Sequence, residues 1–161
     1  MTVEEIKKLL GLVPHPREGG CYVRTFEASE LVATRVGERR TSTAIYYLLE
    51  PGTFSEMHRL KSDEVFHHYI GGAVEMLQLL PDGTGRRVVI GKDLEAGERP
   101  QVVVERGVWQ GSRLMTEDGF ALLGCTVSPG FEFEDYDAGA RAKLTQAWPE
   151  WHRLIAALTR Q

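Results

Sequence analysis

The stretch that decides the fold runs from Gly52 to Gly71 and reads GTFSEMHRLKSDEVFHHYIG. Two parts of it, residues 53–60 and 64–70, alternate between the two faces that a strand would present. Because successive side chains of a strand point to opposite sides of a sheet, this pattern predicts two sequential β-strands.

Each of these strands carries a titratable group on its apolar face. His58 shares a face with Phe54 and Leu60, and Glu64 shares a face with Phe66 and His68. We therefore expect His58 and Glu64 to converge at one end of the structure. There, an imidazole and a carboxylate can bind a divalent transition metal, work as base and acid, or only hydrogen-bond to each other or to nearby backbone.

Further short runs of β-branched, aromatic and alternating residues lie on both sides of this stretch. They are Cys21–Phe26, Thr43–Leu49, Ala73–Leu80, Arg86–Ile90, Gln101–Glu105 and Phe120–Ser128. Turn residues such as those of 81–85 and 117–119 separate them, and no helix-length segment intervenes. Parallel βαβ units are thereby excluded, and the pattern predicts a mostly β fold, a jelly-roll-like β-barrel.

Both ends of the chain have helical patterns. Thr2 and Glu5 form a capping box ahead of an amphipathic segment, and Gly11 is placed to end a short N-terminal helix. At the other end, apolar residues repeat from Trp151 to Leu158 at helical spacing, after Pro149. We expect these helices, which belong to one core with the strands, to make residues 1–161 a single domain.

The composition limits compartment and partners. The 161 residues carry a net charge of −4, contain no Lys/Arg run and contain no apolar run long enough to span a membrane. We therefore expect a cytoplasmic protein with no nucleic-acid or membrane partner. Cys21 and Cys125 lie in apolar runs, which predicts small buried hydrophobes rather than a disulfide.

Other residues are weaker candidates. Of Tyr46 and Tyr47, one must face the interior, as a core residue or as a proton donor. Trp109 is a candidate for stacking on a planar or sugar-like ligand, or for core packing. The acidic segment Glu132–Asp137 is expected to be a solvated connection with anchoring aromatic residues.

Two motifs resemble those of the cupin superfamily. Gly52, His58, Glu64 and Gly71 stand at the spacing of the first cupin motif, with Leu60 where that motif has its second His. The second motif is partly matched by the segment Glu105–Gln110, in which Gly107 matches and Gln110 replaces the metal-binding His.

A closer resemblance extends over nearly the whole chain. It rests on residues 10–20, 42–49, 58–64, 107–110 and 124–131, which are similar to a small single-domain cupin family known as a domain of unknown function (Cupin_5). This resemblance implies a cupin jelly-roll barrel, a homodimer, and a cavity similar to that of deoxysugar-nucleotide epimerases. It implies no particular reaction.

Three functions follow from these motifs. The preferred one is a small-molecule-binding cupin that acts as a metal-independent, epimerase-like enzyme on a sugar-like or carbonyl metabolite by proton transfer. Its catalytic residues would be His58, with Glu64 orienting it, and Tyr47; its substrate-binding residues would be Thr43, His68, Trp109 and Gln110. The alternatives are a non-catalytic ligand-binding module and a metal-dependent cupin enzyme.

In the metal-dependent alternative, His58, Glu64 and a further His hold a divalent transition metal. Strict alternation puts His68 in phase with Glu64, whereas the family pattern favours His67 as the ligand. A β-bulge would reconcile the two patterns. We expect one of His67 and His68 to reach the cavity and the other to lie at the surface or at an oligomer interface.

Overall fold

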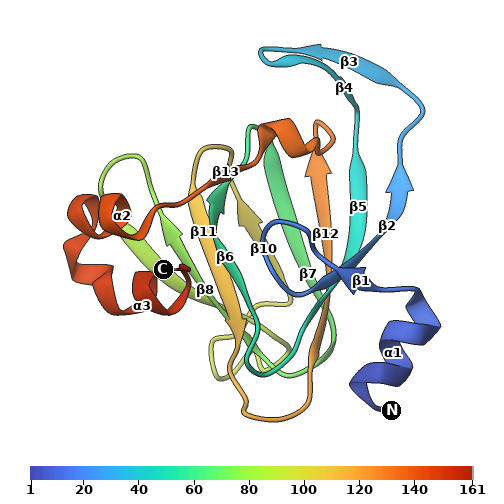
Figure 1. Cartoon of the computed structure of the whole chain (residues 1–161), viewed down its shortest axis with the longest axis vertical. Coiled ribbons are helices and arrows are strands. Elements are labelled where there is room, and N and C mark those ends of the chain that lie inside the picture. Colours follow the sequence, from blue (N-terminus) through green and yellow to red (C-terminus); the bar gives the residue numbers. More distant parts are fainter. Residues whose placement is uncertain (161) are drawn as a thin grey trace.

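Two β-sheets face each other in the computed structural model, which describes residues 1–160 (Figure 1). In spatial order, the first sheet consists of β1 (Val13–Pro14), β2 (Cys21–Glu27), β5 (Thr43–Leu49), β12 (Ala121–Ser128), β7 (Asp63–Gly71) and β10 (Gln101–Val104). The second consists of β13 (Asp137–Ala138), β6 (Phe54–Arg59), β11 (Trp109–Leu114), β8 (Val74–Leu79) and β9 (Gly85–Ile90). Neighbouring strands are antiparallel, which confirms the predicted mostly β, jelly-roll-like barrel.

The inward faces of the two sheets form the main core. Its largest fully buried members include Tyr47, Leu49, Met76, Ile90 and Leu123. Each such side chain contributes roughly 1.5–3 kcal/mol through the apolar surface that it removes from water. This packing fixes the strands and thereby the inward-facing polar groups described below.

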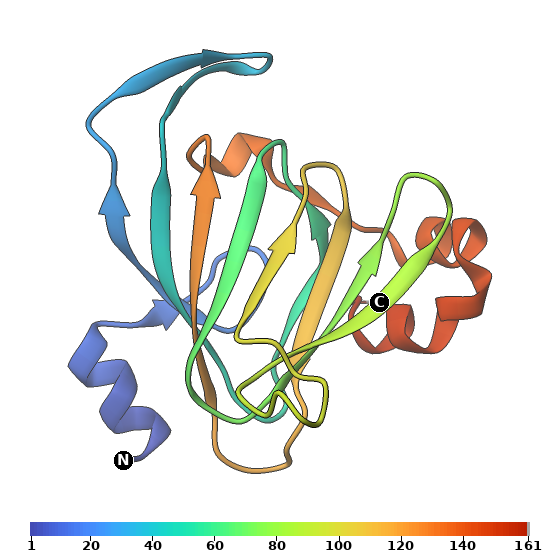
Figure 2. The ribbon, with the colours of Figure 1, turned by 180° about the vertical axis from the view of Figure 1, so that it is seen from behind.

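The predicted terminal helices are present and cover the outer faces of the sheets (Figure 2). Helix α1 (Val3–Leu10) has the predicted capping box and ends at Gly11, and its Ile6 packs with Leu122 of the first sheet. Helices α2 (Arg141–Ala147) and α3 (His152–Ala157), with the 3₁₀ turn η2 (Pro149–Trp151), pack on the second sheet. None of the helices within residues 1–160 has both the length and the apolar character needed to cross a bilayer.

Besides the two-residue strands β1 and β13, three strands were not among those expected from the sequence. One is β11, whose Gly111 and polar residues obscure the strand pattern. The others are β3 (Leu31–Thr34) and β4 (Gly37–Arg40), which pair only with each other. They form a hairpin that projects beyond one end of the barrel, as both ribbon views show (Figures 1 and 2).

Two of the three register shifts in the sheets affect strands that carry predicted site residues. The first lies between β6 and β11, so that Ser55 as well as His58 points inward. Phe54, which alternation placed beside His58, instead packs outside with the C-terminal helices, and that expectation is wrong. The second shift leaves Tyr69 unpaired between β7 and β12, and because this bulge lies beyond His67 and His68, it does not bring His67 into phase with Glu64.

Candidate functional site

His58 is the centre of a buried polar cluster between the sheets. Its Nδ1 lies 2.6 Å from the backbone oxygen of Glu56, so the Nδ1–H donates to that carbonyl and the free Nε2 faces the interior. The imidazole also stacks on the ring of Tyr136, with centroids 4.9 Å apart. Burial lowers the pKa of His58, which leaves a neutral base at physiological pH.

The partner of Nε2 is Glu18, a residue that the sequence patterns did not single out. Glu18 lies in the leader, residues 15–20, the loop that crosses the barrel between β1 and β2 (Figure 1). Its Oε2 is 3.5 Å from His58 Nε2, and its Oε1 is 3.5 Å from the Ser55 hydroxyl. Burial raises the pKa of the Glu18 carboxyl to about 8, so a protonated acid faces the neutral imidazole.

The leader is held inside the barrel by its backbone. The predicted catalytic Tyr47 is fully buried, and its hydroxyl donates to the Gly19 carbonyl over 2.6 Å. The Glu56 amide donates to the Glu18 carbonyl over 2.8 Å. At Gly20, φ is +68° and an added Cβ would lie 2.7 Å from the Leu48 carbonyl oxygen, so only glycine fits this close approach.

Glu64 and Gln110 form the second polar pair of the site. The amide nitrogen of Gln110 donates to Glu64 Oε2 over 2.6 Å. Burial, together with the nearby Glu18, raises the pKa of Glu64 to about 7. Glu64 does not orient His58, because the Glu56 carbonyl holds the imidazole and Gln110 holds Glu64, but its charge does act on the pKa of His58, raising it against the effect of burial.

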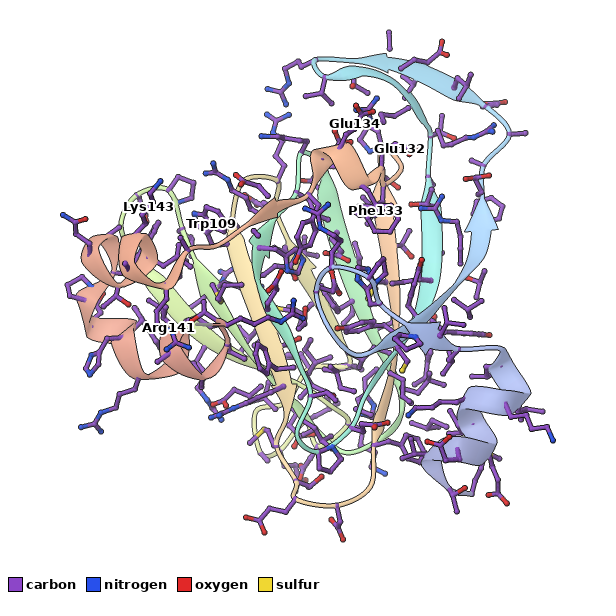
Figure 3. The ribbon with its side chains drawn as sticks, viewed as in Figure 1. Trp109, Glu132, Phe133, Glu134, Arg141 and Lys143 are labelled. Carbon is purple, nitrogen blue, oxygen red and sulfur yellow. The ribbon has the colours of Figure 1, made fainter. Side chains whose placement is uncertain are left out.

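His15 closes the site from the leader side. Its Nδ1 accepts from the backbone N–H groups of Arg17 and Glu18, and its ring lies 4.6 Å from that of Tyr22. Phe133 lies in the 3₁₀ turn η1 (Phe133–Asp135) (Figure 3), and the centroid of its ring is 6.0 Å from that of His15. Burial lowers the pKa of His15 to about 4, so this imidazole is also neutral.

Little empty space remains beside these groups. The pocket beside them has a volume of about 30 Å³ and is lined by His15, Glu18, Tyr22, Arg24, Thr43, Ile45, Leu60, Glu64, Cys125, Val127 and Phe131. The predicted substrate-binding residue Thr43 lines this pocket, and its hydroxyl oxygen accepts the Phe131 N–H over 2.9 Å. Cys125 is a buried free thiol, as expected, whereas Cys21 is free but only half-buried.

Three predicted residues lie elsewhere. Trp109 is on the outer side of the second sheet with the C-terminal helices (Figure 3), where the Arg59 guanidinium covers its ring at 4.4 Å. His67 stacks on Tyr69, which lies over Gly124 on the outer face of the first sheet. His68 is four residues beyond Glu64, roughly 13 Å along β7, and its Nε2 meets the Gly72 carbonyl at 3.0 Å.

The acidic segment Glu132–Asp137 is not simply a solvated connection. Asp135 and Tyr136 are buried, the former against Arg39 and the latter against His58. Tyr136 is thus one of the anchoring aromatic residues that were expected, whereas the burial of Asp135 was not foreseen, because a charged run between elements is typical of an exposed loop. Glu18 was missed for the same reason, since a Pro- and Gly-rich leader gives no sign that it enters the barrel; the only signal was its inclusion in the family resemblance.

The residues present do not fit a cupin metal centre. Buried Leu60 occupies the position of the second His and has no ligating atom. The amide nitrogen of Gln110 points at Glu64, which leaves this pair engaged with each other. Within residues 1–160, no three His, Cys, Asp or Glu side chains are grouped to hold a metal ion.

Comparison with known proteins agrees with this fold. A hypothetical protein from Leishmania major superposes with a TM-score of 0.92 at 32% identity, over 100% of both chains. An uncharacterized protein of Saccharomyces cerevisiae is 33% identical over 106 residues, or 64% of this chain and 53% of the yeast protein. The match thus spans about half the length of the yeast relative.

A more distant solved structure shares the architecture alone. It is a mutant of oxalate decarboxylase from Bacillus subtilis, which superposes with a TM-score of 0.57 at 15% identity and covers 94% of this chain and 36% of that one. The sequence profile of the family described as Cupin superfamily (DUF985) matches residues 4–139. The chain therefore belongs to this cupin family, as its motifs predicted.

Proposed function

We propose that the protein is a metal-independent enzyme that transfers a proton on a small sugar-like or carbonyl-containing metabolite. The observation that carries this proposal is the facing pair of His58 Nε2 and Glu18 Oε2, 3.5 Å apart in a water-poor interior. A neutral imidazole beside a protonated carboxyl is a base and an acid in the same site.

The reaction needs only these side chains. His58 Nε2 accepts a proton from the carbon next to the substrate carbonyl, and the electron pair of that C–H bond moves to form an enolate. The protonated Glu18 carboxyl donates a hydrogen bond to the developing oxyanion, since the Tyr47 hydroxyl proton is already donated to the Gly19 carbonyl. Return of a proton to carbon gives the starting compound or its isomer, so that atoms and electrons balance without an external reactant.

The leader must move for a substrate to enter. Small-molecule sites usually enclose roughly 300–1,000 Å³, whereas the cavity beside His58 has about 30 Å³. The leader fills the remaining space and carries Glu18. Its closure over a substrate would therefore exclude water and complete the acid–base pair in one step.

Exchange of carbon-bound hydrogen in D₂O tests this proposal even when the product is unidentified. A panel of small keto acids, keto sugars and their phosphate esters is incubated with the protein, and loss of the proton next to the carbonyl is followed by NMR. We expect exchange with at least one compound, reduced about 10²–10⁴-fold in His58→Ala. His152→Ala, which changes an exposed His on α3, should retain full exchange.

Two results would reject the proposed enzyme. Equal exchange rates in His58→Ala and the native protein would show that His58 is not the base. Saturable binding of a panel compound without exchange, retained in His58→Ala, would instead identify a non-catalytic binding module.

A further inference from the structure

A second candidate site lies outside the barrel, at the rim beneath the β3–β4 hairpin. We call it the rim groove; it has a volume of about 940 Å³. Its walls are hairpin residues 32–36 on one side and residues 59–63, 106–107 and 128–129 of the barrel on the other. None of the acid–base groups described above lines it.

The rim groove has an excess of positive charge. Arg35, Lys61 and Arg106 line it and are exposed, and within residues 1–160 their side chains make no ion pair or hydrogen bond. A fourth cation, Arg59, is already paired with Asp137 at 2.7 Å. The single carboxylate in the lining, Asp63, accepts the Arg106 backbone N–H. Three unpaired cations in a chain of net charge −4 favour an anionic ligand.

The groove also offers apolar surface and a free hydroxyl. Val32 and Val36 line the hairpin side, and Leu60 and Pro129 line the barrel side. Ser62 is nearly buried in the lining, and its hydroxyl makes no side-chain hydrogen bond within residues 1–160. Apolar surface beside unpaired cations and a hydroxyl is suited to a ligand that carries both an anionic group and an organic part.

The groove is formed before any ligand arrives. Arg39 of β4 donates to both carboxylate oxygens of Asp135, over 2.7 and 2.8 Å, in a pair that is shielded from solvent. The Gly130 N–H adds a bond to the Arg40 carbonyl over 2.7 Å. These contacts fix the hairpin relative to the barrel, so that the groove is already formed. Less conformational entropy is therefore lost when a ligand binds.

We propose that the rim groove binds a phosphorylated small organic molecule. The phosphate lies among Lys61, Arg106 and Arg35, and the organic body lies against Val32 and Val36. Phosphate has several oxygens, which can accept charge-assisted hydrogen bonds from Arg and Lys at the same time. This assignment is independent of the buried site and holds whether or not His58 is catalytic.

The test is a titration of ¹⁵N-labelled protein with phenyl phosphate, inorganic phosphate and phenol, followed by NMR. Phenyl phosphate should shift the amides of Val36, Ser62 and Gly107, bind more tightly than inorganic phosphate, and lose affinity as salt is added. Phenol, which lacks the charge, should leave them unshifted. Lys61→Glu and Arg106→Glu should each weaken binding about tenfold or more.

The matched control is Lys143→Glu, a charge reversal at an exposed lysine of α2 (Figure 3). It should bind phenyl phosphate as the native protein does. Equal weakening in all three variants would overturn the proposal, because it would show attraction by overall charge alone. Shifts confined to residues around His58 would overturn it too. So would groove amides that move with protein concentration in the absence of phosphate, which would show that a second copy fills the groove.

Discussion

At the scale of single residues, the notable feature is a set of carboxyls and imidazoles that burial makes neutral. Glu18 and Glu64 are pushed toward the protonated form, while His15 and His58 are pushed toward the uncharged form. Desolvation is the largest cause in each case, since a charge is costly to bury. The cluster therefore places protonated carboxyls beside neutral imidazoles, and the protonation of these groups is linked to folding.

Stability should fall as pH rises from about 6.5 to about 8. The folded protein retains protons on Glu18 (pKa about 8) and Glu64 (about 7) that the unfolded chain, with carboxyl pKa values near 4.5, has already released. The two imidazoles have the opposite effect, but only below their ordinary pKa of 6.5. Calorimetry should show a melting temperature that is several degrees lower at pH 8 than at pH 6.5.

Glu18→Gln should flatten this dependence, because the amide remains uncharged at every pH. Glu117→Gln, at an exposed acid, should leave it unchanged. A melting temperature that is constant between pH 6.5 and 8 in the native protein would contradict the raised pKa values.

Gly20→Ala should destabilise the fold by roughly 1–3 kcal/mol and release the leader. The new Cβ would meet the Leu48 carbonyl at 2.7 Å and the Tyr47 hydroxyl at 2.9 Å. Urea unfolding measures the first effect, and the rate of tryptic cleavage after Arg17 measures the second. Gly83→Ala is the control, since Gly83 also has a positive φ but no atom within 4 Å of its added Cβ. If both variants lost equal stability, the close approach at Gly20 would not be the cause.

At the scale of elements, the hairpin and the leader differ in how they are attached. The leader is a loop that is hydrogen-bonded to strands of both sheets, through Tyr47 of β5 and Glu56 of β6, whereas the hairpin is a two-stranded ribbon outside them (Figure 1). A two-stranded hairpin is marginal by itself in water. Its position therefore depends on side chains that reach the barrel, chiefly Arg39 bound to Asp135.

Asp135→Asn should loosen the hairpin while the barrel remains folded. The new side-chain amide has no negative charge to pair with Arg39. Only its single oxygen can accept a hydrogen bond from the guanidinium. Hydrogen exchange of the β3 and β4 amides should become about tenfold faster or more, with β5 and β12 unchanged. Glu134→Gln provides the comparison, because Glu134 is largely exposed and contacts Arg39 at 3.2 Å. Unaltered exchange in Asp135→Asn would mean that other contacts hold the hairpin.

At the scale of the whole molecule, the barrel is a cupin in which some inward positions carry side chains that differ from those of the cupin motifs. Leu60 and Gln110 stand where two ligands of the cupin pattern would be, so His58 and Glu64 are left with other partners. The proposed proton transfer needs one base and one acid, which His58 and Glu18 would supply. The same barrel thus supports a site of a different kind.

Elemental analysis of the native protein should find far less than one equivalent of transition metal. The double variant Leu60→His, Gln110→His restores imidazoles at both positions and should bind about one equivalent, since three His and a Glu make a strong donor set. Single variants should bind weakly. One tight equivalent in the native protein, lost in His58→Ala, would contradict the metal-independent function.

The sequence by itself determined most of the strand pattern, the terminal helices, the family, and the inward positions of His58 and Glu64. These depend on side-chain alternation, capping and motif spacing, which are local properties. The tertiary structure decided the partners: Glu18 and Tyr136 reach His58 from segments with the composition of exposed loops, and a register shift turned Ser55 inward in place of Phe54. Trp109, His67 and His68 lie away from the site. The packing of the two sheets determines which face and which end of a strand border the cavity. Burial, and with it the protonation of every group in the site, exists only once the chain has folded.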